Sequence, residues 1–207
     1  MSKSKNKKKL ANKKKKQKAH HRKLDAAEEL SDIGIDLSDE IYNIGIIFNN
    51  LTISHLTYVG LNYINKICTN YVGIDICLFV EQLSRPCIQP QCAVGEIKDL
   101  FNWRQPLIAT DINTCIYALN SPSQQIYYYV FDIEFINNYT LSWDIIKRCF
   151  YDPRITLIAR HSDHKKLIED EFNIKISNMI IEDFDLVSMI RLIIKDIKNG
   201  TKTTVKT

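Results

Sequence analysis

The chain has 207 residues, of which 45% are hydrophobic, enough for one domain of ordinary size with a buried core. The net charge of +4 hides an asymmetry, because residues 1–23 carry 12 Lys or Arg and no acid, leaving 16 basic against 24 acidic residues elsewhere. The sequence shows no apolar stretch of the roughly 20 residues that span a bilayer, and no apolar segment of a secretion signal. We therefore expect a soluble cytoplasmic protein.

The first 40 residues are expected to lie outside the folded domain. Residues 1–23 have few apolar side chains and strong like-charge repulsion, so burial cannot offset their ordering entropy and they are predicted to be disordered. Residues 24–40 are predicted to be a linker with helical tendency. A basic arm of this kind can bind nucleic acid or an acidic partner. The lysines expected to contact such a polyanion are Lys7, Lys8, Lys9, Lys13, Lys14, Lys15 and Lys16.

Residues 41–200 are predicted to form a single α/β domain, because short β-rich apolar runs alternate with amphipathic stretches. Strands are expected at 42–48, 74–80, 106–110, 126–131, 155–159 and 176–181. Helices are expected over 56–67, 111–118 with Asp111 as cap, 141–150, 162–172 with Ser162 as N-cap, and from the Asp185 cap to a stop at Gly200. Residues 81–104 are predicted to be an irregular loop with a short helix at 94–101, and residues 201–207 to be frayed.

None of the expected strands is joined to the next by a tight hairpin turn, which implies crossover connections. The predicted fold is a doubly wound, mostly parallel sheet of about six strands with helices on both faces, Rossmann-like. Tyr127, Tyr128 and Tyr129 are expected to pack in the core, with alternate rings facing opposite helix layers. The six cysteines form no CxxC pair, which indicates reduced core residues in a cytosol-like compartment.

In an open parallel sheet, ligands bind beyond the carboxyl ends of the strands, so polar residues just after each apolar run are the candidates for function. They are Asn49, Asn50, Glu81, Asp111, Asp132, Glu134, His161, Ser162, His164, Glu182 and Asp183. Asp132 and Glu134 are the predicted catalytic pair, because alternation along an extended chain places both acids on one face and each raises the pKa of the other. The alternative is that the strand has simply emerged into water.

The segment from Arg160 to His164 follows a predicted strand and opens a predicted helix. Its amides and imidazoles can hold a phosphate or sugar-phosphate at the positive helix end, so His161, Ser162 and His164, together with Asp111, are the predicted substrate-binding residues. The alternative is an ordinary Ser cap with exposed histidines. No zinc site is expected, since the two histidines have no clear third ligand.

Several familiar signatures are absent from the sequence. There is no GxxxxGK[ST] loop, no GxGxxG after the first strand, no GxSxG elbow and no HExxH. This argues against a P-loop NTPase, a Rossmann dehydrogenase, a serine hydrolase and a zincin protease.

Three stretches, PLIATDI, YYYVFDIEF and ITLIARHSDHKKLIEDEFNIKISNMIIEDFD, together resemble the later strands of the N-terminal, acceptor-side domain of GT-B type glycosyltransferases, particularly phage-encoded ones. The resemblance covers residues 42–185 as topology and about fifty residues as motif. It implies that Asp111, Asp132, Glu134 and residues 161–164 border an acceptor cleft. The donor domain of that family would begin about where this chain ends, so donor binding is expected either to come from a donor-domain partner chain or to be missing, as in an inactive or accessory domain.

Two functional hypotheses follow from these observations. The first is a glycosyltransferase-like domain, or an accessory half of one, that acts on or binds a sugar or a nucleotide sugar, with or without a divalent cation. The second is a non-catalytic, nucleic-acid-associated or virion protein whose Lys-rich tail binds phosphates. The abundance of Ile, Asn and Lys is typical of an AT-rich genome, for which a virus or phage is one source, and the location would then be the host cytoplasm.

Overall fold

The computed structural model describes residues 41–133, 142–176 and 180–203, with side chains up to Gly200. The predicted tail and linker, Glu134, and residues 204–207 lie outside this part of the chain. What was predicted for them therefore stays a prediction.

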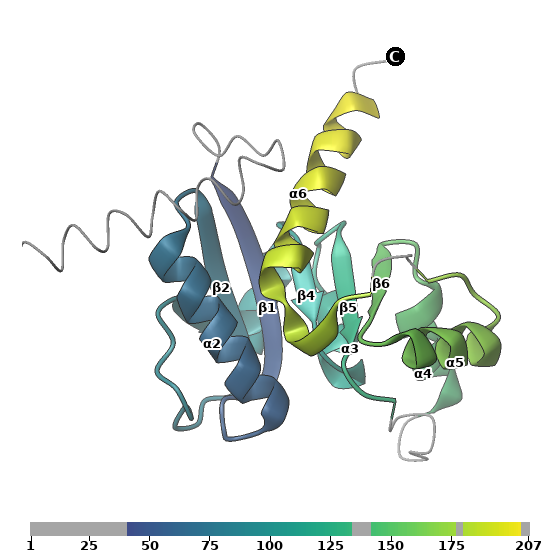
Figure 1. Cartoon of the computed structure of the whole chain (residues 1–207), viewed down its shortest axis with the longest axis horizontal. Coiled ribbons are helices and arrows are strands. Elements are labelled where there is room, and N and C mark those ends of the chain that lie inside the picture. The colour runs from purple at the N-terminus through teal and green to yellow at the C-terminus, as the bar shows by residue number, and fades with distance from the viewer. Residues whose placement is uncertain (1–40, 134–141, 177–179, 204–207) are drawn as a thin grey trace, which may run out of the picture.

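Six parallel strands form a single sheet in the order β3-β2-β1-β4-β5-β6 (Figure 1). They are β1 (Tyr42–Asn50), β2 (Ile74–Gln82), β3 (Ala93–Glu96), β4 (Leu107–Ala109), β5 (Ile126–Val130) and β6 (Ile155–Ala159). The chain builds outward from β1 in one direction and then crosses to β4 and builds in the other. This order puts a topological switch point between β1 and β4, where open α/β sheets bind their ligands.

Helices cover both faces of the sheet, as Figure 1 shows, and the predicted doubly wound, Rossmann-like fold is confirmed. One face carries α2 (His55–Asn70), η3 (Glu182–Phe184) and α6 (Leu186–Thr203). The other face carries η1 (Ile97–Asn102), α3 (Ile112–Leu119), α4 (Trp143–Tyr151) and α5 (Ser162–Phe172). Within the described residues no helix has the length and hydrophobicity to cross a membrane.

The central strands are buried on both faces, which explains their continuous apolar runs. All five residues of β5 are buried. Tyr127 and Tyr129 pack in the core under α2 and α6, whereas Tyr128 packs in the core under α3 and α4. The predicted alternation of the three tyrosines is therefore confirmed.

The sixth strand of the observed sheet is β3 and not residues 176–181, of which 177–179 lie outside the described part of the chain. Residues 176–181 contribute only an isolated bridge between Ala159 and Ile180 within the described residues, and the sheet is instead completed by β3, from a segment predicted to be irregular. The periodicity of β3 is weak because it is an edge strand with Ala93 and Val94 exposed. The connection to it contains no α-helix and is held against α2 by hydrogen bonds from the Asn65 side chain to Gln89 O (3.0 Å) and from Gln91 N to the Asn65 side chain (2.8 Å).

Helix ends show which local signals were reliable. Asp111 caps α3 and Asp185 accepts from the first amides of α6, both as predicted. The Ser162 prediction is wrong, because His161 occupies the N-cap position of α5 without a side-chain bond and Ser162 is the first helical residue. Gly200 does not end α6, which runs to Thr203. It is exposed, and a Cβ placed at this position would meet no atom within 4 Å.

Candidate functional site

The polar residues predicted to share one rim do lie at one edge of the sheet. Asp111 follows β4, Asp132 follows β5 and His161 follows β6, and these three strands are parallel neighbours in register. Burial raises the pKa of Tyr128, and the carboxylates of Asp111 and Asp132 each add to that shift, so both lie near this tyrosine. We call this set of strand ends, with residues 49–55 and 182–185, the carboxyl edge.

At the switch point, the Asn49 side chain at the end of β1 donates a hydrogen bond of 2.5 Å to Asp111 Oδ2. Asp111 Oδ1 accepts from Thr114 N (2.9 Å), and the Thr114 hydroxyl accepts from Asp111 N, so the carboxylate is fixed by a capping box. Burial raises the pKa of Asp111, although its hydrogen bonds with Thr114, Asn113 and Asn49 oppose the shift. The switch point between β1 and β4 therefore contains an oriented carboxylate and an amide.

The loop after β1 differs from a dinucleotide-binding loop in its chemistry. It contains no glycine between Asn49 and the start of α2, and its Ser54 side chain accepts from Thr57 N at the helix cap. In the glycine-rich dinucleotide-binding motif, a phosphate binds the free amides at the start of the helix. Here the Ser54 side chain occupies that position at the start of α2. Recognition at this edge must therefore come mainly from side chains.

Arg160, directly after β6, is the main cation of the carboxyl edge. Its guanidinium carbon lies 4.2 Å from the ring centroid of Phe131, which follows β5, and its NH2 group bonds to Asp183 at 3.2 Å. Its Nε is buried and has no hydrogen-bond partner among the described residues. The same Phe131 ring packs against His55 of α2, with centroids 5.6 Å apart.

His161 and His164 lie beside this arginine, with ring centroids 5.4 Å apart. Burial, and then the neighbouring charges of His161 and Arg160, lower the pKa of His164, and Asp132 opposes the shift. The His164 imidazole is therefore neutral at neutral pH, with a buried Nδ1 that lacks a partner within the described residues. Ser162, by contrast, is exposed and its predicted capping role is not observed.

Two further candidates from the sequence, Glu81 and Asp183, differ in their surroundings: Glu81 is hydrogen-bonded to a tyrosine, and Asp183 has a strained backbone. Glu81, the penultimate residue of β2, accepts a 2.6 Å hydrogen bond from Tyr117 of α3, which raises the pKa of Tyr117 to about 12. Asp183 and Phe184 have positive φ angles of 45° and 56°, an unfavourable conformation for non-glycine residues. Tyr129 stabilises it, since its hydroxyl accepts from Phe184 N (3.0 Å) and donates to Ile181 O (2.8 Å).

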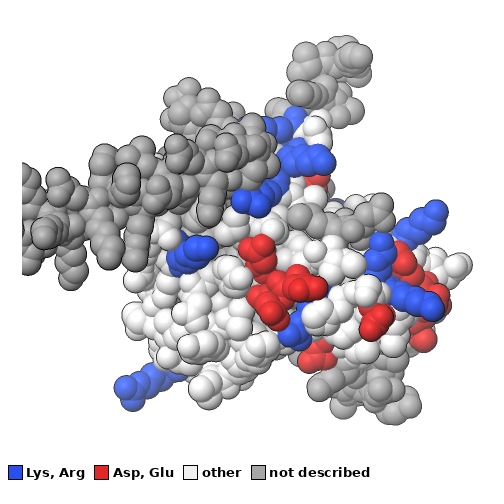
Figure 2. Space-filling model, viewed as in Figure 1, with Lys and Arg blue, Asp and Glu red and all other residues white. Residues whose placement is uncertain are grey.

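The space-filling view shows acidic side chains gathered around the start of α6 with basic side chains near them, while other basic side chains lie along the far half of α6 (Figure 2). Asp132 itself is exposed just beyond β5. Its predicted catalytic partner, Glu134, is outside the described residues, so their pairing stays a prediction. The described residues contain no group of three or more His, Cys, Asp or Glu placed to hold a metal ion.

Sequence reasoning missed Phe131 and His55 as parts of this edge. Phe131 was counted as the last residue of a buried strand, whereas β5 ends one residue earlier and frees its ring to stack with Arg160. His55 carried no signal, because nothing local indicates that the start of α2 meets the end of β5. Both belong to the site only through tertiary contacts.

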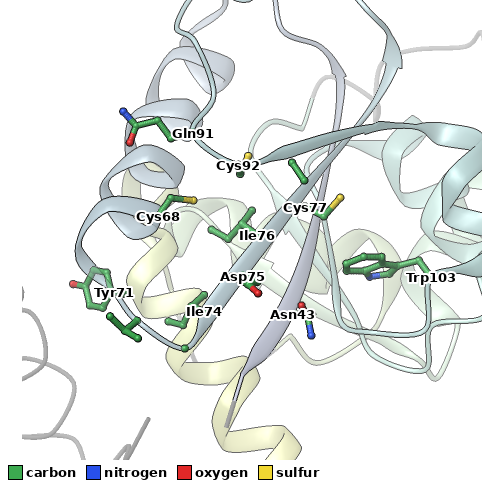
Figure 3. A pocket seen from close by; sticks show the side chains of 13 residues that line it. Asn43, Cys68, Tyr71, Ile74, Asp75, Ile76, Cys77, Gln91, Cys92 and Trp103 are labelled. Carbon is green, nitrogen blue, oxygen red and sulfur yellow. The ribbon is translucent and has the colours of Figure 1, made fainter. Parts of the chain in front are cut away.

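A cavity among the described residues lies elsewhere. It has a volume of about 660 Å³ and is lined by the amino ends of β1 and β2, the end of α2 and the segment before β3 (Figure 3). Its lining is thiol-rich and includes Cys68, Cys77 and Cys92. The cavity is thus at the opposite edge of the sheet from the convergent charged side chains, and we place the candidate site where the polar chemistry is.

Comparison with known proteins adds no relative, since no family model, no curated protein and no solved structure matches the chain.

Proposed function

We propose that the chain is a glycosyltransferase-like domain that binds a sugar or sugar-nucleotide at the carboxyl edge. The observation that supports this most directly is that three of the four buried polar atoms without partners in the described residues lie at this edge: Asn49 Oδ1, Arg160 Nε and His164 Nδ1, the fourth being Arg191 Nε in α6. Leaving a polar group buried and unpaired costs about 1–3 kcal/mol. Three such atoms at one edge of a sheet are suited to a ligand that supplies both donors and acceptors.

The chemistry of the three groups fits a phosphorylated sugar better than a purely apolar or purely anionic ligand. An amide oxygen accepts from a sugar hydroxyl, a neutral imidazole nitrogen accepts or donates according to its tautomer, and a guanidinium donates to phosphate. The Phe131 ring beside Arg160 supplies an apolar surface of the kind that sugar rings and bases pack against. In this proposal Asp111, His161 and His164 orient the substrate.

Asp132 has the role of general base in this proposal. It is exposed at the end of β5, so a substrate hydroxyl can reach it, and its charge acts on His164. A carboxylate in that position can accept the proton of an acceptor hydroxyl as the hydroxyl attacks the anomeric carbon of a nucleotide sugar, whose bond to the phosphate oxygen breaks and releases the nucleoside diphosphate. The donor half is assigned to a partner chain, as the resemblance to GT-B enzymes implies.

A thermal-shift panel of UDP-glucose, GDP-mannose and inorganic phosphate tests the binding proposal. A ligand that binds only the folded state raises the Tm in proportion to RT ln(1 + [L]/Kd), so at least one nucleotide sugar should stabilise the full chain. Arg160→Met should abolish that shift. The control is Arg148→Met, which makes the same change at an exposed position of α4 away from this edge.

The catalytic part of the proposal is tested separately with the donor-binding partner present. Asp132→Asn should leave the nucleotide-sugar shift in place and reduce sugar transfer by at least about 100-fold, the usual contribution of a general base. Absence of a Tm shift with every donor, with and without a partner chain, would overturn the binding proposal. Unchanged transfer in Asp132→Asn would overturn the assigned base alone.

The charge asymmetry of the sequence supports a second candidate, a nucleic-acid-associated protein that binds phosphates through Lys7–Lys9 and Lys13–Lys16. Such binding should weaken with salt, with a log-log slope of about 0.7–0.9 per phosphate neutralised. Deleting residues 1–23 should abolish it. Binding that is independent of salt, or that survives the deletion, would contradict this candidate.

A further inference from the structure

The structure places two half-buried thiols together at the amino edge of the sheet, far from the carboxyl edge. Cys68 is in the last turn of α2, and Cys92 immediately precedes β3. Both are free, and both line the 660 Å³ cavity, where Figure 3 shows the Cys68 side chain projecting from the helix toward Cys92. A hydrogen bond joins the two thiols.

Hydrogen bonds hold the Cys92 segment on the helix that carries Cys68. Asn65, one turn before Cys68, bonds through its side chain to Gln89 O at 3.0 Å and to Gln91 N at 2.8 Å. The Thr69 hydroxyl, next to Cys68, donates to the Gln91 side chain at 2.7 Å. These contacts hold the residues just before Cys92 against the turn of α2 that carries Cys68, and a disulfide requires the two cysteines to be held close together in this way.

We propose that Cys68 and Cys92 form a reversible redox pair that peroxide oxidises to an intramolecular disulfide. The Cys68 thiolate attacks one peroxide oxygen, the O–O bond breaks, and the hydroxide that leaves takes up a proton to give water. Cys92 then loses its proton as its sulfur attacks the sulfur of the Cys68 sulfenic acid, and the displaced hydroxide takes up that proton to give the second water. The two thiols lose two electrons and two protons, and hydrogen peroxide is reduced to two molecules of water.

The electrostatics assign the attacking role to Cys68. The hydrogen bond from Cys92 lowers the pKa of Cys68, although burial and Asp75 oppose the shift. The same hydrogen bond, with burial and the nearby thiols, raises the pKa of Cys92. The thiolate is the reactive form, so Cys68 reacts with peroxide first and Cys92 resolves the sulfenic acid.

The chain contains a matched control for this pair. Cys77 lines the same cavity but packs with the opposite core, under η1 and α3, and burial raises its pKa. Cys77 is therefore exposed to the same cavity as Cys92, but it lacks the hydrogen bond that Cys92 makes with the Cys68 thiol of α2. Oxidation that depended only on exposure to the cavity would affect Cys77 as well.

Peptide mapping of the full chain by mass spectrometry under non-reducing conditions, after treatment with hydrogen peroxide, tests the pair. The expected product is a cross-linked peptide joining Cys68 to Cys92, with loss of two hydrogens, that dithiothreitol removes. It should persist in Cys77→Ser and be absent in Cys68→Ser and Cys92→Ser. The oxidised wild-type chain should also unfold several degrees higher, because the link constrains the unfolded chain.

Two outcomes would overturn the proposal. One is that Cys68 and Cys92 stay reduced at a peroxide concentration that oxidises Cys77. The other is that Cys77 or Cys87 appears in the cross-link as often as Cys92 does. Both can be read from the wild-type chain alone, so they hold even where a variant fails to fold, and neither depends on nucleotide-sugar binding.

Discussion

Strand β6 has an arginine at each end, and the two are used differently. Arg154, before the strand, donates from Nε to Asp152 at 3.1 Å, from NH1 to Ser121 O and Ser123 O at 3.2 and 3.3 Å, and from NH2 to Leu119 O and Asp152 at 3.0 and 3.2 Å. Arg160, after the strand, has an ion pair with Asp183 and a buried Nε without a partner among the described residues.

The comparison separates a structural arginine from one available to a ligand. Arg154 has every guanidinium donor satisfied by groups of the protein, so no donor remains for recognition. Arg160 retains a free Nε donor among the described residues, and its guanidinium is held in place by the Phe131 ring and Asp183. The two arginines have the same charge, but they differ in how many of their guanidinium N–H donors are already bonded to the protein.

Replacing each arginine by methionine gives the largest expected difference. Arg154→Met removes five hydrogen bonds and leaves Asp152 and three backbone carbonyls without their donor, so we expect a loss of about 2–4 kcal/mol in the free energy of unfolding. Arg160→Met should cost less than about 1 kcal/mol, because Asp183 is 68% exposed and a solvated ion pair contributes little.

Urea denaturation of both variants measures this difference. Arg154→Lys is the matched control for charge, and it should recover only part of the stability because an ammonium cannot span the carbonyls that the planar guanidinium reaches. Equal losses in the two methionine variants would refute the distinction between the two ends of β6.

Tyr127 and Tyr129 allow the same comparison with neutral groups. The Tyr129 hydroxyl bonds to two buried backbone groups, Ile181 O and Phe184 N, at the strained turn. The Tyr127 hydroxyl donates to the Asp196 carboxylate of α6 at 3.0 Å, and that carboxylate is partly exposed. Tyr129→Phe should therefore cost about 1–3 kcal/mol by leaving buried groups unsatisfied, and Tyr127→Phe less than about 1 kcal/mol because water can solvate Asp196.

Hydrogen exchange adds a local measurement to the denaturation curves of these two variants. Tyr129→Phe should speed exchange at the Phe184 amide, whose hydrogen bond it removes, well beyond the change in global stability. Tyr127→Phe should leave that amide protected. Similar exchange in both variants would mean that the turn is held by packing alone.

The sequence predicted the parts of this structure that depend on local signals. β6 was predicted with its observed ends, because it is a short apolar run between polar residues, and the Asp111 cap was predicted from its type and position. The edge strand β3 was missed because Ala93 and Val94 are exposed and show no alternation. An edge strand is defined by its neighbour, and that neighbour is distant in the sequence.

The sequence predicted which edge of the sheet carries the site, but it did not predict the side-chain contacts within the site. Parallel strands fix which residues reach the carboxyl edge, so Asp111, Asp132 and His161 were placed together correctly. The hydrogen bond from Asn49 to Asp111 joins residues 62 positions apart, and the stacking of Arg160 on Phe131 depends on where β5 ends. Such contacts require the packed fold and have no signature in residue spacing.

The smallest expected effect concerns two carboxylates at opposite edges of the sheet, Asp111 and Asp152. Burial raises the pKa of Asp111 above its ordinary value of 3.8, so ionisation is harder in the folded state and stability decreases as pH rises through the raised pKa. The Arg154 guanidinium lowers the pKa of Asp152, so its contribution to stability is present above pH 3.8 and is lost as pH falls through the lowered pKa.

The two asparagine variants should therefore respond to pH in opposite directions. Asp111→Asn keeps an N-cap side chain, and its free energy of unfolding relative to wild type should increase between acid and neutral pH, because the variant has no carboxylate to ionise in a buried position. Asp152→Asn should be less stable than wild type at neutral pH, with a deficit that shrinks on acidification. Urea denaturation across this pH range measures both slopes, and slopes of the same sign would show that burial at the switch point does not control the titration of Asp111.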